Sequence, residues 1–206
     1  MTSATDAGSP VLGVREAQRL KTRARVFDAA VAEIDRSGLA GADVAAIAAA
    51  AGVVRGTFYF HFPTKEHVLV ELERAEEVKM VAKLETRASK PGDLVSMLTL
   101  LAREVLAAER RLGPVVFRDM LGLHFSATRP AQDALAEHPL AEFVIAAITE
   151  AQAAGQVSAD ADAGELGMIF LTGLFALLAT GATASGARSA LLDRYVKTIV
   201  VGMEKR

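Results

Sequence analysis

A short stretch of the sequence carries side chains that suit nucleic-acid recognition. At 100° per residue, one side of a helix starting near Arg55 would carry Arg55, Gly56, Tyr59 and Phe60. This side predicts a surface that binds in a nucleic-acid groove, because it combines two outward aromatics, an arginine and a glycine that permits close approach. The opposite side would carry Val54, Phe58 and Phe62, which can close a small core. The alternative is an ordinary helical hairpin whose end happens to be aromatic.

A second candidate contact follows at Pro63. Thr64 is a suitable N-cap for a further helix, and Lys65 then lies in its first turn. The helix dipole disfavours a cation there, whereas a phosphate would accept from the free N–H groups and pair with the ammonium. The alternative is that Glu66 or solvent neutralises Lys65.

Two further helices are needed to position this surface. Asp43 is a good N-cap, and an apolar face follows at Val44, Ile47, Ala48 and Ala51. Gly52 can take the left-handed conformation that ends this helix in a tight turn. An earlier helix, with Gly38 as its stop, has the stripe Val26, Phe27, Ala30, Val31 and Ile34. The pattern predicts a three-helix unit.

Three segments resemble the DNA-binding domain of the TetR family of bacterial transcription regulators. They are residues 22–30, 48–53 and 56–66, and the resemblance extends from Thr22 to Leu72. It implies that Arg55 and Thr57 face bases, and that phosphates are held by Tyr59, His61 and Lys65. Together with Gly56, Phe60 and Thr64, these residues form the candidate DNA-binding set.

The sequence departs from that family in three places. Val54 stands where a capping Ser or Thr is usual, and Ala45 where many members have an Arg that reaches DNA. Phe60 occupies an outward position that is more often polar. These departures bear on the operator sequence and not on the mode of binding.

Length and composition indicate a globular protein with a sizeable core, because the 206 residues are 51% hydrophobic and 23% charged. The helical patterns predict an all-α fold, with an N-terminal helix-turn-helix domain joined to a larger helical domain for ligand binding and dimerisation. The expected divisions are a disordered tail at 1–14, the DNA-binding domain at 15–65 and the larger domain at 66–206. The tail lacks the features of a signal peptide. The absence of cysteine excludes disulfides and thiolate metal sites, which fits a cytoplasmic location.

Charge is distributed unevenly along the chain. The net charge is −2, but residues 15–65 hold eight basic and five acidic residues and so carry +3. Arg15, Arg19, Lys21, Arg23 and Arg25 form a basic entry to the first helix. This entry either steers phosphates or is an ordinary solvated helix end.

The helices from Asp93 to Ala179 carry more large apolar side chains than one core layer needs. By resemblance, this region encloses a pocket, and filling it shifts the helix after Thr64. Such sites are mostly apolar with a few polar groups, so we expect a hydrophobic small molecule. The alternative is a fully packed core. The candidate ligand-binding residues, with His124, Arg118 and Thr172 as polar contacts, are Phe117, Arg118, Met120, Leu121, His124, Phe143, Ile148, Met168, Thr172 and Phe175.

The last two helices are rich in apolar residues. The 166–179 helix is apolar all round but too short to span a bilayer, so we expect no membrane partner. This much apolar surface at the end of a small protein suggests a homodimer interface. The candidate dimerisation residues are Leu174, Leu178, Leu192, Tyr195, Val196, Ile199, Val200 and Met203.

No catalytic or metal-binding pattern stands out, and no cofactor is expected. The four histidines, at 61, 67, 124 and 138, do not share helical spacing beside a carboxylate. The loop at 158–164 lacks the ligand spacing of a calcium loop. We therefore expect a homodimeric regulator, not an enzyme, that binds a near-palindromic operator as a repressor and is released by the hydrophobic molecule. The alternatives are a helical ligand carrier or a small all-α enzyme, each with a vestigial helix-turn-helix.

Overall fold

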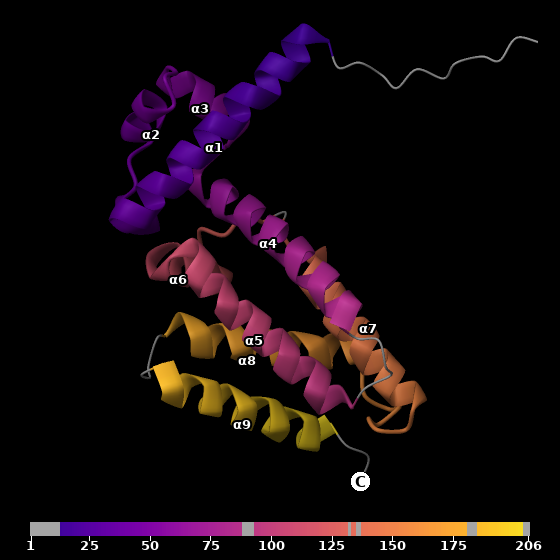
Figure 1. Cartoon of the computed structure of the whole chain (residues 1–206). Helices are drawn as coiled ribbons and strands as arrows, with labels where there is room; N and C mark the ends of the chain where they lie inside the picture. The colour runs from indigo at the N-terminus through magenta and orange to yellow at the C-terminus, as the bar shows by residue number, and fades with distance from the viewer. Residues whose placement is uncertain (1–12, 88–92, 132, 135–136, 181–184, 204–206) are drawn as a thin grey trace, which may run out of the picture.

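The computed structural model describes residues 13–87, 93–131, 133–134, 137–180 and 185–203. All regular structure within those ranges is helical (Figure 1). The elements are α1 (Val14–Gly41), α2 (Val44–Ala50), α3 (Arg55–His61), α4 (Lys65–Arg87), α5 (Leu94–Leu112), α6 (Pro114–Gly122), the 3-10 turn η1 (Leu123–Phe125), α7 (Pro139–Ala153), α8 (Ala163–Ala179) and α9 (Ser185–Met203). The predicted all-α fold is confirmed.

Helices α1 to α3 form a small unit at one end of the molecule (Figure 1). The Asp43 carboxylate accepts from the N–H of Ala45 at 2.9 Å, as expected of an N-cap. Gly38 and Gly52 take φ values of 70° and 64°. Gly52 lies in the turn after α2, whereas Gly38 kinks α1, which continues to Gly41 and does not stop there as predicted. The core of this unit is Val26, Ala30, Ile47, Ala51, Phe58, Phe62 and Val68.

Val54 does not join that core, which corrects the prediction. It is the N-cap of α3, with extended backbone angles, and its side chain is 75% exposed. Helical periodicity does not apply to a residue that precedes the first turn, so its side chain leaves in a different direction.

Helix α4 joins the two parts of the molecule without a linker. Its Val68 lies in the small core, whereas Leu69, Leu72 and Met80 lie in the larger one. The predicted division at residue 65 falls at the start of this helix. A movement of α4 therefore moves side chains in both cores.

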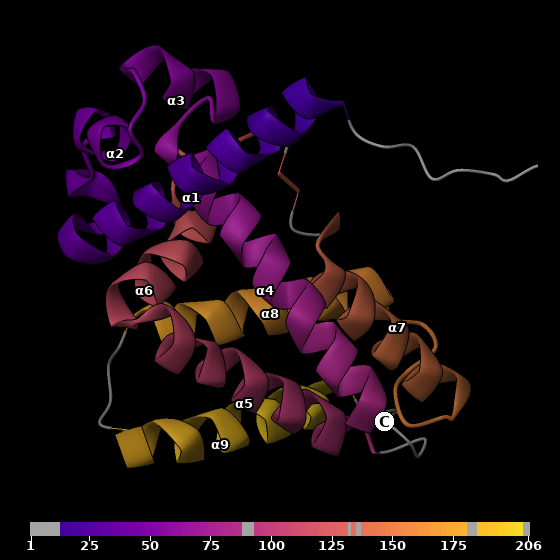
Figure 2. The ribbon, with the colours of Figure 1, turned by 45° about the horizontal axis from the view of Figure 1, so that its top comes forward.

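Helices α5 to α9 pack around the larger core with α4. Helix α4 packs against α7, and α5 lies alongside α9 (Figure 2). Among the largest fully buried side chains here are Leu98, Leu101, Phe117, Phe170 and Phe175. The predicted 115–125 helix ends as α-helix at Gly122 and continues as the 3-10 turn η1.

In the described part of the chain, no single helix is both long and apolar enough to cross a membrane. The bent pair α2 and α3 reaches the required length and apolarity only jointly.

Candidate nucleic-acid interface and effector cavity

The outward face of α3 carries the side chains predicted to meet DNA. Arg55, Gly56, Tyr59 and Phe60 are exposed, and Phe60 is 71% exposed. On the other side, Phe58 is fully buried, and its ring lies 6.0 Å from that of Phe62. Burial of these two rings fixes the rotation of α3 about its axis, which leaves Arg55, Tyr59 and Phe60 facing outward.

Arg55 and Tyr59 are neighbours on that face. The Arg55 guanidinium donates to the Tyr59 hydroxyl at 3.3 Å and lies 5.7 Å from the ring centre. Residues four apart on a helix are adjacent, and a cation above an aromatic ring is attracted to it. Tyr59 therefore limits the positions that the guanidinium can take.

Thr57 and His61 are half-buried at the edges of the same helix. Burial, followed by the charges of Arg23 and Arg19, lowers the pKa of His61 below its usual value. The ring of His61 also lies 5.0 Å from that of Phe60.

Lys65 contacts α1 and is not directed at a free surface. Its ammonium donates to the carbonyls of Ala40 at 3.0 Å and Ala42 at 3.2 Å. This differs from the expectation that the ammonium awaits a phosphate, because the unpaired carbonyls past the kink of α1 attract it. Thr64 is exposed, with its hydroxyl 3.0 Å from His67 Nδ1.

The basic entry to α1 is partly neutralised. Arg19 pairs with Glu16 at 2.6 Å, while Arg23 pairs with Glu71 and lies 4.5 Å above the Phe62 ring. The remaining members, Arg15, Lys21 and Arg25, are exposed. They are available for phosphates, whereas Arg23 has a structural role.

A small cavity lies between α4, α5, α6, α7 and α8. Its volume is about 10 Å³, close to what one water molecule needs. Two acidic residues of α4 interrupt an otherwise apolar wall, and the lining residues are Glu73, Glu77, Met80, Val105, Ala108, Phe117, Met120, Leu121, Leu140 and Phe175.

Beside this cavity is a buried polar network that joins α4 to the segment before α7. The two nitrogens of His138 face Glu77 at 3.1 Å and Asp133 at 2.8 Å. His124 Nε2 contacts Glu73 Oε1. Burial opposes the charged form of His138, but the hydrogen bond and charge of Glu77, with Glu73 and Asp133, outweigh it and raise the pKa of His138. Burial also raises the pKa of Glu77.

Comparison with known sequences matches the region that contains α2, α3 and most of α1. Residues 26–72 match the family model for bacterial regulatory proteins of the tetR family. The chain is 36% identical over 93 residues to the HTH-type transcriptional regulator AcrR of Shigella flexneri. That match spans 45% of this chain and 40% of the relative. This N-terminal region is therefore of the TetR type. The family model describes bacterial regulatory proteins, and AcrR is a transcriptional regulator.

Solved structures of regulators share the fold over the larger domain as well. Thermus thermophilus FadR, solved with lauroyl-CoA, has a TM-score of 0.74 at 21% identity and covers 89% of this chain and 96% of its own. Bacillus subtilis FadR, solved with stearoyl-CoA, has a TM-score of 0.62 at 20% identity, with coverages of 88% and 99%. FadR of Bacillus halodurans has a TM-score of 0.61 at 23% identity, with the same coverages.

The apolar candidate ligand-binding residues lie in three environments. Phe117, Met120, Leu121 and Phe175 line the cavity. Ile148 lies in the surrounding core, and Phe143 and Met168 are half-buried outside the lining.

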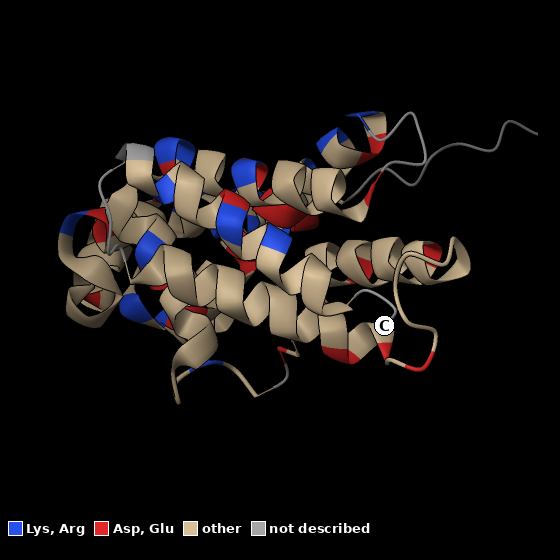
Figure 3. Cartoon of the chain, turned by 90° about the horizontal axis from the view of Figure 1, so that it is seen from below, with Lys and Arg blue, Asp and Glu red and all other residues tan. Residues whose placement is uncertain are grey.

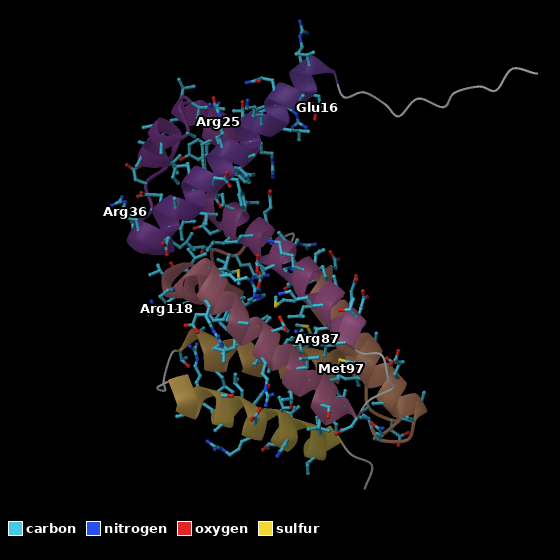
Figure 4. All side chains as sticks on the ribbon, viewed as in Figure 1. Glu16, Arg25, Arg36, Arg87, Met97 and Arg118 are labelled. Atoms are coloured by element: carbon cyan, nitrogen blue, oxygen red, sulfur yellow. The ribbon has the colours of Figure 1, made fainter. Side chains whose placement is uncertain are left out.

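The structure differs most from the prediction at the residues expected to make polar contacts with the ligand. Arg118 and Thr172 are exposed, so their assignment to the cavity is wrong. Each follows a buried residue on its helix and so points about 100° away from it. In Figure 4, Arg118 projects from α6 away from the interior, and it lines a surface groove of about 510 Å³ beside α1. His124 is nearly buried but is held by Glu73, with its ring 4.7 Å from Phe175.

The dimerisation residues require a larger correction. Six of them are already buried inside the single chain: Leu174, Leu178, Leu192, Val196, Val200 and Met203. Tyr195 stacks on Phe170 and donates to its carbonyl at 2.7 Å, and Ile199 is half-buried. The broad apolar face of α9 thus packs on α5 and α8 within the same chain, so it is not the surface that a second copy would cover.

Glu73 and Glu77 are the site residues that sequence reasoning missed. Both are buried, as is Glu76. They continue the inward spacing set by Leu69, Leu72, Met80 and Leu84. Acidic residues at inward positions of a helix were the available signal, because a buried carboxylate requires a partner.

Proposed function

We propose that the chain is a ligand-responsive, DNA-binding transcriptional repressor that is released from its operator by a small molecule with a large apolar part. The observation that carries this proposal is the exposed face of α3, where Arg55, Tyr59 and Phe60 project outward from a helix anchored by two buried rings. An exposed apolar residue beside an arginine suits the major groove, where thymine methyls and guanine edges are both presented.

Contacts to DNA divide into base and phosphate contacts in this proposal. Arg55 and Thr57 face bases, with Phe60 against a thymine methyl, while Gly56 permits the approach. Tyr59 and His61 contact phosphates. A further phosphate binds the free N–H groups at the start of α4, near Thr64 and Lys65. Seen from below, Lys and Arg segments lie among Asp and Glu segments along the ribbon (Figure 3).

Effector and operator are linked through α4 and α6. Helix α4 lines the cavity with Met80 and reaches the small core with Val68. Helix α6 lines it with Phe117, and its Asp119 accepts from the N–H of Leu39 at 2.6 Å, beside the kink of α1. A molecule that widens the cavity displaces both helices and shifts the unit that reads DNA.

The cavity must open for this mechanism to operate. At about 10 Å³ it admits no organic effector as it stands. An effector shifts the protein towards the opened arrangement only to the extent that it binds the opened arrangement more tightly than the closed one. Coupling of about 1–3 kcal/mol, or 5–150-fold in operator affinity, is ordinary. The acyl-CoA complexes of the two FadR structures support a hydrocarbon chain as the apolar part.

The proposed regulator acts as a homodimer. With the inward face of α9 buried, the surface left for a partner includes Ile169 and Thr172 on α8 and Thr198 and Val201 on α9. A two-fold pairing makes the operator a near-palindrome, with recognition helices about 34–36 Å apart on DNA.

Selection of genomic fragments with the purified protein tests the function. We expect enrichment of a near-palindromic site, and an affinity that falls steeply with salt as counterions are displaced. Absence of any enriched, salt-sensitive site would contradict the proposal and favour a ligand carrier or an enzyme. Turnover that survives removal of residues 1–65 would favour the enzyme.

A further inference from the structure

The buried network beside the cavity contains the donor atoms of a metal site. One atom each from Glu73, Asp133 and His138 lie within 4.8 Å of one another. The side chains of all three are at most 5% exposed. They come from α4, from the segment before α7 and from the start of α7, so only the tertiary fold brings them together.

Hydrogen bonds to imidazole hold this arrangement together. The two ring nitrogens of His138 face Glu77 and Asp133. His124 Nε2 contacts Glu73.

We propose that a divalent transition-metal ion binds here, coordinated by His138 Nε2 and by carboxylate oxygens of Asp133 and Glu73. The ion binds at Nε2, and Nδ1 keeps its hydrogen bond to Glu77. A metal-bound histidine typically donates its other N–H to a carboxylate, which fixes the ring and its tautomer. Glu77 already makes that contact at 3.1 Å. His124 lies against Glu73 Oε1 and supplies a second imidazole within reach.

Arg129 competes for the same carboxylates. Its guanidinium pairs with Asp133 and lies 3.5 Å from Glu73 Oε2. Within the described residues, Arg129 Nη1 is buried without a hydrogen-bond partner, and Asp133 Oδ2 is held only by the ion pair with Arg129. The ion would supply a ligand bond to the second of these atoms. The guanidinium would then be released towards Asp133's backbone carbonyl, which it already approaches at 3.4 Å.

The donor set narrows the class of metal. Imidazole with carboxylates suits Zn²⁺, Fe²⁺, Ni²⁺ and Cu²⁺, whereas all-oxygen sites suit Mg²⁺ and Ca²⁺. Without thiolates, the site has no preference for Cu⁺. The ion would tie α4 to the start of α7, next to two lining residues of the cavity, Glu73 and Leu140. Binding of the ion does not depend on the chain being a DNA-binding repressor.

Titration of chelator-treated full-length protein with Zn²⁺ tests the site, with Mg²⁺ as the control ion. We expect one saturable Zn²⁺ site per chain, a higher Tm with Zn²⁺, and no response to Mg²⁺. This titration needs no variant. No saturable binding at micromolar Zn²⁺, or an equal response to Mg²⁺, overturns the proposal.

Variants locate the site. His138→Gln and Asp133→Asn should each weaken Zn²⁺ binding at least tenfold, and His67→Gln, whose histidine lies near the start of α4, should leave it unchanged. Arg129→Gln should tighten Zn²⁺ binding, because a competing cation is removed. If the cluster is only a set of structural ion pairs, Arg129→Gln binds no Zn²⁺. Wild-type affinity in both His138→Gln and Asp133→Asn also overturns the assignment.

Discussion

Single residues of α3 decide what the recognition surface presents. Tyr59 accepts a hydrogen bond from Arg55 and lies beside its guanidinium, so the arginine is partly ordered before DNA arrives. Ordering a long side chain in advance reduces the entropy that binding must remove. The two residues are therefore best considered as one unit.

Arg55→Ala should weaken operator binding by about 1–3 kcal/mol and relax specificity at one base position, because a bidentate contact to guanine is lost. Fluorescence anisotropy with the selected operator and its single-base variants measures both effects. Arg194→Ala, in an exposed arginine of α9, is the matched control. Unchanged affinity in Arg55→Ala would assign base reading to other residues.

His61 should make operator binding depend on pH. Its pKa is lowered by burial and by Arg23 and Arg19, so it is mainly neutral at neutral pH in the free protein. A bound phosphate favours the charged ring and raises its pKa, so binding takes up a proton. The added affinity is present below the pKa of the complex and is lost as the pH rises through it. Operator affinity should therefore increase from about pH 7 to about pH 5.5, around the usual histidine pKa of about 6.5.

Titrations at constant ionic strength test this dependence, with His61→Gln as the comparison. The variant should lose the increase and keep the affinity seen at pH 8. An increase of the same size in the variant would place the titrating group elsewhere.

At the scale of elements, the close approach of α8 and α9 depends on one glycine. A Cβ added at Gly173 would lie 2.3 Å from the Tyr195 hydroxyl, whereas one at Gly202 would meet nothing within 4 Å. Tyr195 in turn donates to the backbone of α8. The helices are therefore fixed in register by a small residue facing a large one.

Gly173→Ala should destabilise the protein by about 1–3 kcal/mol, because the added methyl overpacks the contact with Tyr195. Gly202→Ala, in an open helical position, should be neutral or stabilising by up to about 1 kcal/mol, since alanine is the better helix former. Urea unfolding monitored by circular dichroism compares the two. Equal stabilities would mean that α8 and α9 adjust their separation at little cost.

At the scale of the whole molecule, one face of α9 packs in the core of the chain and the other is exposed. Val196 is fully buried in the chain's own core, while Val201 is 63% exposed and Ile169 of α8 is 57% exposed. Exposed aliphatic side chains on neighbouring helices are what a second copy can cover.

Val201→Asp combined with Ile169→Asp should give a folded monomer, because charges are placed where the partner packs. Val196→Asp should instead unfold the chain, because it buries an unpaired carboxylate in the core. Light scattering reports the mass and circular dichroism the helix content. A folded Val196→Asp monomer, with the double variant still dimeric, would return the interface to the inward face of α9.

The sequence by itself determined the helix-turn-helix. Asp43, Gly52 and the spacing of Phe58 and Phe62 act within a few residues of one another, and local capping, turn geometry and helical period are enough to predict the result. The left-handed turn at Gly52 and the outward position of Phe60 follow from the same short-range rules. The error at Val54 arose from applying helical periodicity to a residue outside the helix, and the predicted stop at Gly38 is a kink.

Only the tertiary structure decided which apolar faces are core and which residues meet across the fold. Burial in a core and burial against a second copy remove the same kind of surface from water, so the period of α9 could not distinguish them. Glu73 and Glu77 meet His124 and His138 over separations of 51 and 61 residues. No spacing rule reaches that far, because such contacts depend on how whole helices pack.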